Sequence, residues 1–198
     1  QNPLFVGFSA ITGRQAYDAA LVCQFLKKKH PEIITVWGGI HTSLVPEQTL
    51  KQDYIDFIIK YEGEETIVDF TETFIAERKD FSSILGLGYK ENGKTIINKD
   101  RPFINLPDYE LEAEDWECID VEKAIYTDPT TGDRIFDIQT SRGCPFNCGF
   151  CYNTRFTKRK MRFFAPEQVE RMGKLLHDKY GVNAIKFTDD NIYSKYDR

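Results

Sequence analysis

Residues 141–153 read SRGCPFNCGFCYN and contain three of the five cysteines of the chain, Cys144, Cys148 and Cys151, at the spacing C-x3-C-x2-C. Thiolates this close together favour a soft metal or an iron–sulfur cluster. Three ligands are one fewer than the usual four, so one coordination position would stay open, as in catalytic metal sites. The odd number and close spacing argue against a disulfide framework. Structural zinc remains an alternative, although the nearest histidine, His177, is far downstream.

This stretch, here called the cysteine loop (141–153), resembles the motif of the radical S-adenosylmethionine (SAM) superfamily, in which an aromatic residue precedes the last cysteine, as Phe150 does. The resemblance implies that the three cysteines hold a 4Fe-4S cluster whose open iron binds SAM. It also implies that the reduced cluster cleaves SAM to a radical that takes hydrogen from a substrate. Phe150 and Tyr152 are then expected to contact SAM, with Phe150 beside the adenine.

The composition is that of a globular protein. The chain has 198 residues, 41% of them hydrophobic, and a formal net charge of −5, which gives no sign of general nucleic-acid binding. No apolar run approaches the ~20 residues of a membrane helix, and no secretory signal is visible. Few, clustered cysteines without such a signal predict a cytoplasmic location. Because the chain starts at Gln1 close to a strand and stops at Arg198 just after another, we expect it to be a fragment.

The first half alternates apolar, β-branched runs with amphipathic segments. Strands are predicted over 4–9, 33–37 and 56–59, and helices over 14–29, 46–51 and from the acidic turn 62–65 to about 77. The apolar face of the first helix consists of Ala16, Ala19, Ala20, Cys23 and Leu26. Cys23 is therefore expected in the core. This alternation predicts a parallel sheet, and such sheets bind ligands at the carboxyl ends of their strands.

Short motifs follow the predicted strands of the first half. Ser9 ends the first strand and Ile11 follows it, and 26 residues separate Ile11 from the Gly38-Gly39 pair after the second strand. This pattern resembles the later part of the cobalamin-binding signature of Rossmann-like domains, although Ile11 stands where leucine is usual. The residues that the resemblance assigns to cobalamin are Ser9, Ile11, Gly38, Gly39, Glu62 and Gly63. Ordinary turn chemistry is the alternative for the serine and the glycines.

The earlier motif of that signature, Asp-x-His-x-x-Gly, is absent from the chain. No lower axial cobalt ligand can therefore be assigned. His41 follows the glycine pair, but we do not assign it that role, because a lone loop histidine is usually polar surface.

The middle of the chain is expected to connect two domains. Asn92-Gly93, between two strand-like runs, is a strong hairpin signal. The stretch 108–122 carries eight acidic residues, which we interpret as a solvated surface. We therefore interpret 79–131 as a hairpin and an acidic linker with one or two short helical turns. The side chains expected to pin this linker to a domain surface are Trp116, Cys118 and Ile119; Cys118 is not counted as a metal ligand.

The second half predicts a strand over 134–140 that runs into the cysteine loop, a helix over 165–180 stopped by Gly181, and a strand over 182–188. A strand–loop–helix–strand unit is the first crossover of a barrel. The radical SAM fold is a partial (β/α) barrel with its cysteines after the first strand, so the placement agrees. In such barrels catalytic groups gather on loops at the carboxyl ends of the strands.

Charged residues flank this unit. Asp189 and Asp190 end the last strand, and the resemblance implies that one of them contacts the amino group of SAM; a turn or capping role is the alternative. A basic run over 155–162 is either solvated surface or a site of attraction for an anionic substrate or an acidic electron donor.

Together the motifs identify the chain as a member of the cobalamin-binding-domain-containing radical SAM family, similar to class B methyltransferases. The predicted fold class is α/β. It comprises the C-terminal part of a Rossmann-like cobalamin-binding domain (1–78), the linker (79–131), and the first βαβ unit of a radical SAM partial TIM barrel (132–198).

The family resemblance implies an enzyme that reductively cleaves SAM at a 4Fe-4S cluster to activate an unreactive substrate carbon. Methyl transfer is expected ahead of cyclisation or rearrangement. Two alternatives stay open: a radical SAM enzyme whose Rossmann-like domain is only a scaffold, and a non-catalytic zinc-binding module. The implied cofactors are the 4Fe-4S cluster, SAM and cobalamin. The implied partners are a small-molecule or natural-product substrate and a reductant such as flavodoxin or ferredoxin, with no nucleic acid and no membrane segment.

Overall fold

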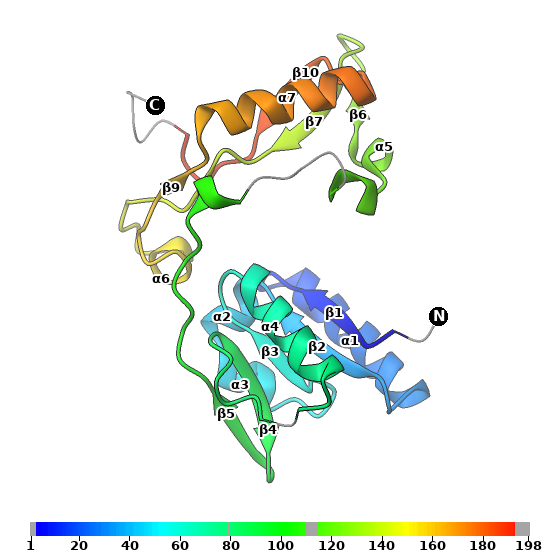
Figure 1. Cartoon of the computed structure of the whole chain (residues 1–198), viewed down its shortest axis with the longest axis vertical. Helices are drawn as coiled ribbons and strands as arrows, with labels where there is room; N and C mark the ends of the chain where they lie inside the picture. Colours follow the sequence, from blue (N-terminus) through cyan, green and yellow to red (C-terminus); the bar gives the residue numbers. More distant parts are fainter. Residues whose placement is uncertain (1–2, 79, 110–114, 193–198) are drawn as a thin grey trace. The chain divides into compact units, whose positions relative to one another are not determined.

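The computed structural model describes residues 3–78, 80–109 and 115–192. The chain divides into two compact units, 1–103 and 104–198, and Figure 1 labels most of their helices and strands. Within the described residues, no helix combines the length and apolar character needed to cross a membrane.

The first unit is built on a sheet in the order β1-β2-β3-β4-β5. The first three strands run parallel, and the last two are antiparallel to their neighbours. The strands are β1 (Phe5–Ser9), β2 (Ile34–Gly38), β3 (Phe57–Ile59), β4 (Leu87–Glu91) and β5 (Lys94–Ile97). The helices are α1 (Arg14–Lys29), α2 (Ile40–Leu44), α3 (Pro46–Leu50) and α4 (Glu64–Ile75).

Apolar side chains cover both faces of this sheet. Neighbouring side chains along a strand point to opposite faces. Trp37 of β2 accordingly packs with Cys23 of α1 and Leu50 of α3, while Val36 packs with Phe70 of α4. Cys23 is fully buried, which confirms its expected place in the core. With both faces covered, the strand ends are the part of the sheet open to ligands.

Several elements have the positions that local sequence signals predict. α1 has the predicted ends, and the hairpin at Asn92-Gly93 is confirmed, with φ of 51° and 74° as a primed two-residue turn requires. Its first strand, β4, pairs with β3. The hairpin therefore extends the first sheet, and the first unit runs to residue 103, beyond the 78 expected from the sequence.

The second unit combines a sheet in the order β10-β7-β6 with a β8-β9 ribbon. β10 and β7 are parallel, as the predicted crossover requires. The strands are β6 (Tyr126–Thr127), β7 (Arg134–Ile138), β8 (Ser141–Arg142), β9 (Arg162–Phe163) and β10 (Ala184–Phe187). The helices are η1 (Leu106–Asp108), η2 (Asp115–Cys118), α5 (Val121–Ala124), α6 (Asn153–Phe156) and α7 (Pro166–Tyr180). Gly181 adopts the left-handed conformation and ends α7, as predicted.

The acidic stretch contributes short helical turns, η2 and α5, as expected. Trp116 is buried against Phe136, with ring centroids 5.6 Å apart, and joins the core of the second unit. The same expectation was wrong for Cys118, which is exposed, and for Ile119, which is 56% exposed. Three of the eight acidic residues in this stretch lie outside the described residues: Glu110, Glu112 and Glu114.

Candidate cofactor sites

The cysteine loop leaves the carboxyl end of β7. Its first two residues form β8, which pairs with β9. Gly143 has a φ of +92°, and a Cβ there would lie 2.1 Å from the carbonyl oxygen of Lys160. Any side chain at this position would collide with backbone, so the entry to the loop requires glycine.

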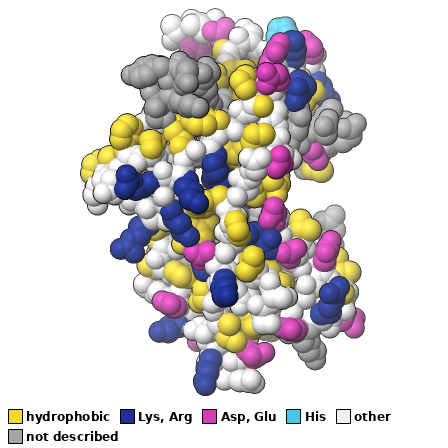
Figure 2. All heavy atoms as spheres, turned by 60° about the vertical axis from the view of Figure 1, so that its left-hand side comes forward, with side chains coloured by type: hydrophobic (Ala, Val, Ile, Leu, Met, Phe, Trp, Pro, Cys, Tyr) yellow, Lys and Arg dark blue, Asp and Glu magenta, His cyan; other side chains and the backbone are white. Residues whose placement is uncertain are grey.

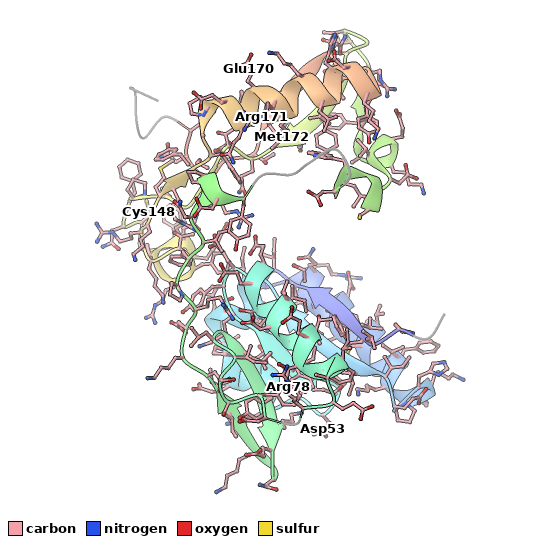
Figure 3. The ribbon with its side chains drawn as sticks, viewed as in Figure 1. Asp53, Arg78, Cys148, Glu170, Arg171 and Met172 are labelled. Atoms are coloured by element: carbon pink, nitrogen blue, oxygen red, sulfur yellow. The ribbon has the colours of Figure 1, made fainter. Side chains whose placement is uncertain are left out.

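The three thiols of the loop are free, and they differ in exposure: Cys148 is exposed, while Cys144 and Cys151 are half-buried. Figure 3 labels Cys148 on this loop. The Cys151 amide donates to the Cys148 carbonyl at 3.1 Å, so these two cysteines are joined by a tight turn. Within the described part of the chain, no three His, Cys, Asp or Glu side chains converge as they would around a bound metal. The donor set of three accessible thiols nevertheless fits a soft metal centre.

The aromatic residues of the loop have different surroundings. Phe150 is 95% exposed and so is open to contact with a ligand. The Tyr152 hydroxyl donates to Asp190 Oδ1 at 3.3 Å. Partial burial, and then the charge and hydrogen bond of Asp190, raise the pKa of Tyr152 to about 12.

The two aspartates after β10 both contact the loop and its approach. The Asp189 carboxylate accepts hydrogen bonds from Thr140 and from the Ser141 hydroxyl. Asp190 Oδ2 accepts the Gly143 amide at 3.1 Å. The structure thus brings both predicted aspartates to the cysteine loop, from 47 to 49 residues away in sequence.

In the first unit, the predicted motifs of β1 and β2 lie side by side. Ser9 is paired with Gly38 in the strand register. Gly39 has φ 92° and ψ −170°, a region open essentially to glycine alone. A Cβ on Gly39 would lie 2.8 Å from both the nitrogen and the oxygen of Ala10. Ile11 is 53% exposed at the same edge.

Ser43 joins the third strand end to this edge. Its hydroxyl donates to the Gly39 carbonyl at 2.8 Å and accepts the Tyr61 amide at 2.7 Å. Tyr61 precedes the predicted Glu62-Gly63 pair, and Gly63 caps the amino end of α4. The three strand-end segments that carry the predicted cobalamin residues are therefore linked at one edge of the sheet.

Sequence reasoning did not single out Ser43 or Thr12. Thr12 Oγ1 lies 3.0 Å from Nδ1 of His41, and burial lowers the pKa of His41. A serine four residues after a glycine turn can bond back to its carbonyl, which was the available signal for Ser43. Nothing in the sequence signals the pairing of Thr12 with His41, 29 residues away.

Two protein families match the chain. Residues 1–71 match the B12 binding domain, and residues 138–198 match the Radical SAM superfamily. An uncharacterised methyltransferase of Pyrococcus horikoshii is 34% identical over 191 residues, covering 96% of this chain and 40% of the relative. An anaerobic magnesium-protoporphyrin IX monomethyl ester cyclase of Rubrivivax gelatinosus is 31% identical over 196 residues, covering 96% of this chain and 34% of the relative. The chain thus spans two fifths or less of the length of these curated relatives.

Solved structures share the fold. The radical SAM methyltransferase TsrM of Kitasatospora setae, bound to tryptophan and a SAM analogue, superposes with a TM-score of 0.69 at 16% identity, over 96% of this chain and 37% of that one. The cobalamin-dependent radical SAM enzyme OxsB, bound to aqua-cobalamin and SAM, gives 0.67 at 20% identity, over 96% of this chain and 26% of that one.

Proposed function

The chain belongs to the family of radical SAM proteins that also carry a B12-binding domain, and from this premise we propose that the protein is a cobalamin-dependent radical SAM enzyme. Its reaction activates an unreactive substrate carbon, and the outcome is methyl transfer. The observation that carries the proposal is the set of three free thiols on the loop at the carboxyl end of β7. The strand-end glycine motif of the first unit supports the cobalamin part.

Cys144, Cys148 and Cys151 would hold a 4Fe-4S cluster. When bound, this cluster with SAM supplies reductive cleavage of SAM and a radical that abstracts hydrogen. Phe150, with its exposed ring, would lie beside the adenine. Tyr152 and one of the two aspartates would complete the SAM contacts. Of these aspartates, Asp190 is the more exposed.

The edge of the first sheet would bind cobalamin. A glycine pair without side chains lets the backbone approach a ligand closely. The Ser9 side chain lies at this edge, since its Oγ would be 3.1 Å from a Cβ on Gly39. The proposed set of cobalamin-binding residues is Ser9, Ile11, Gly38, Gly39, Glu62 and Gly63.

The basic run suits an acidic electron donor such as flavodoxin or ferredoxin. From Ile138 to Pro166 the sequence has six Lys and Arg residues and no carboxylate. Figure 2 shows Lys and Arg side chains gathered on one face, and Arg155, Arg159 and Lys160 are exposed. Electrostatic attraction of this kind is screened by salt, so reduction of the cluster by such a donor should slow as ionic strength rises.

Anaerobic reconstitution of the full chain with iron, sulfide and hydroxocobalamin tests the proposal. We expect about four irons per chain and corrinoid that survives desalting. Cys148→Ala should abolish iron retention, whereas Cys118→Ala, an exposed cysteine outside the loop, should retain wild-type iron. Iron without corrinoid would support the scaffold alternative. Zinc without iron would overturn both enzyme hypotheses.

Cyclisation or rearrangement is the second candidate, because a named cyclase is 31% identical over nearly the whole chain. The two outcomes differ in the products of SAM. Loss of a methyl group leaves S-adenosylhomocysteine, whereas hydrogen abstraction alone leaves 5′-deoxyadenosine. We expect both products when the reconstituted protein turns over with reductant and substrate. Deoxyadenosine alone would favour the second candidate.

A further inference from the structure

We infer that Asp189 and Tyr152 are positioning residues that fasten the cysteine loop at its two ends to the carboxyl end of β10. The inference rests on the proposed function in one respect, that this loop holds the metal. Asp190 serves as the common link between the two ends. We call these three residues the carboxylate clamp.

Asp189 fastens the approach to the loop. β10 and β7 are parallel neighbours, and their pairing continues past the strands, since the Thr188 amide donates to the Ile138 carbonyl at 2.9 Å. Asp189 therefore lies beside the residues that leave β7. Its Oδ1 accepts the Thr140 hydroxyl at 2.9 Å, and both of its oxygens lie 3.2 Å from the Thr140 amide. Ser141 donates its hydroxyl to the same carboxylate.

The donors to Asp189 are shielded from solvent: Thr140 is 4% exposed and Ser141 is fully buried. Hydrogen bonds to an ionised acceptor are stronger than neutral ones, and low local polarity strengthens them further. These contacts engage both oxygens of Asp189. Its role is therefore to hold the approach to the loop.

Asp190 and Tyr152 connect the far end of the loop to its start. One oxygen of Asp190 accepts the Gly143 amide at 3.1 Å, and the other accepts the Tyr152 hydroxyl at 3.3 Å. Gly143 directly precedes the first cysteine of the motif, and Tyr152 directly follows the last. A single carboxylate thus contacts the residues on both sides of the three cysteines.

Fixing both ends of the loop reduces the conformational freedom that its three thiols must lose when they bind a metal. Partners that orient metal ligands typically contribute about 10- to 100-fold to metal affinity. The clamp should therefore slow the loss of iron from the loop. It should also reduce the motion of the loop when no metal is bound.

The second unit supplies a matched control. The Tyr126 hydroxyl donates to Asp137 Oδ1 at 3.0 Å, which is the same pair of groups as Tyr152 and Asp190. This pair lies on β6 and β7, outside the cysteine loop. Tyr126→Phe and Asp137→Asn therefore test whether loss of a tyrosine–carboxylate contact alone affects iron binding.

The experiment measures loss of iron to a chelator from the reconstituted full chain. Tyr152→Phe should lose iron about three- to tenfold faster than wild type, as expected for one hydrogen bond, and Asp189→Asn about 10- to 100-fold faster. Tyr126→Phe and Asp137→Asn should match wild type. Wild-type rates in both clamp variants, or equal acceleration in all four variants, would overturn the inference.

Hydrogen exchange of the metal-free chain tests the clamp independently of the proposed function. Amides of residues 141–153 should exchange about three- to tenfold faster in Tyr152→Phe than in wild type, with the Tyr126→Phe control unchanged. If wild type binds no iron, the proposed function fails, while faster exchange in Tyr152→Phe would still support the clamp. Unchanged exchange would overturn the clamp even if the wild type holds its iron. Tyr152→Phe removes only a hydroxyl, so it keeps the test valid if Asp189→Asn does not fold.

Discussion

The two candidate sites are built in different ways. The edge of the first sheet is formed by backbone: strand register places Ser9 beside Gly38, and Gly39 packs against Ala10. The cysteine loop is held by side chains instead, and the thiols it carries do not converge within the described structure. A slot made of backbone is complete before its ligand arrives. A thiolate site on an exposed loop is completed by the metal, because folding and metal binding are coupled.

The sharpest test of this difference compares two glycines of the cysteine loop. Gly143→Ala would place a Cβ 2.1 Å from the Lys160 carbonyl oxygen at a φ of +92°, whereas a Cβ at Gly149 meets nothing within 4 Å. We expect Gly143→Ala to lose nearly all iron after reconstitution and Gly149→Ala to keep it. Iron counts per chain after desalting measure both. Normal iron in Gly143→Ala would mean that metal binding, rather than the loop backbone, determines the site.

A smaller effect is expected at the backbone-built edge. Gly39→Ala would force a side chain into the conformation open to glycine and against Ala10, which costs about 1–3 kcal/mol of unfolding free energy. Gly7→Ala, in β1 with open space around its Cβ, is the control and should be close to neutral. Denaturant unfolding of the full chain measures the free energies.

Corrinoid retention separates a structural role from a binding role at this edge. If the slot is preformed, a folded Gly39→Ala chain should retain about tenfold less corrinoid than Gly7→Ala, while both retain their iron. Equal corrinoid retention in the two variants would contradict the backbone slot, and absence of corrinoid from wild type as well would favour the scaffold alternative for the first unit.

Local signals in the sequence predicted much of this architecture. Pro166 and Gly181 mark the two ends of α7, and Asn92-Gly93 sets the hairpin. The C-x3-C-x2-C spacing lies within eight residues and requires no knowledge of the fold. Features that depend on residues close together in sequence could therefore be predicted from the sequence alone.

Contacts across long separations were not accessible in the same way. That Asp189 meets Thr140, 49 residues away, depends on β10 packing beside β7. The bond from the Tyr61 amide to Ser43 depends likewise on the third strand lying beside the second. α2 was missed because Gly38-Gly39 signals a turn, and Thr42 and Ser43 are weak helix formers.

The smallest expected effect concerns His41, which lies beside the backbone-built edge. Burial lowers the pKa of His41 in the folded state below its ordinary value near 6.5. Protonation therefore favours the unfolded chain, so the contribution of His41 is present above that ordinary value and is lost as the pH falls below it. The unfolding free energy of wild type should decline from about pH 7.5 to about pH 5.5, by less than Gly39→Ala costs.

His41→Gln should flatten this decline, because glutamine carries no proton in that range. The unfolding free energies of wild type and His41→Gln are compared at each pH. Their difference above pH ~7.5, where the histidine is neutral in both states, serves as the internal reference. Parallel pH profiles for wild type and His41→Gln would show that the edge of the first sheet does not shield this imidazole. Thr12 contacts the His41 ring at 3.0 Å. Parallel profiles would therefore also mean that the contact between the loops that carry Thr12 and His41 is less stable in solution than the pairing of β1 with β2 beside them. The backbone-built site would then resemble the cysteine loop.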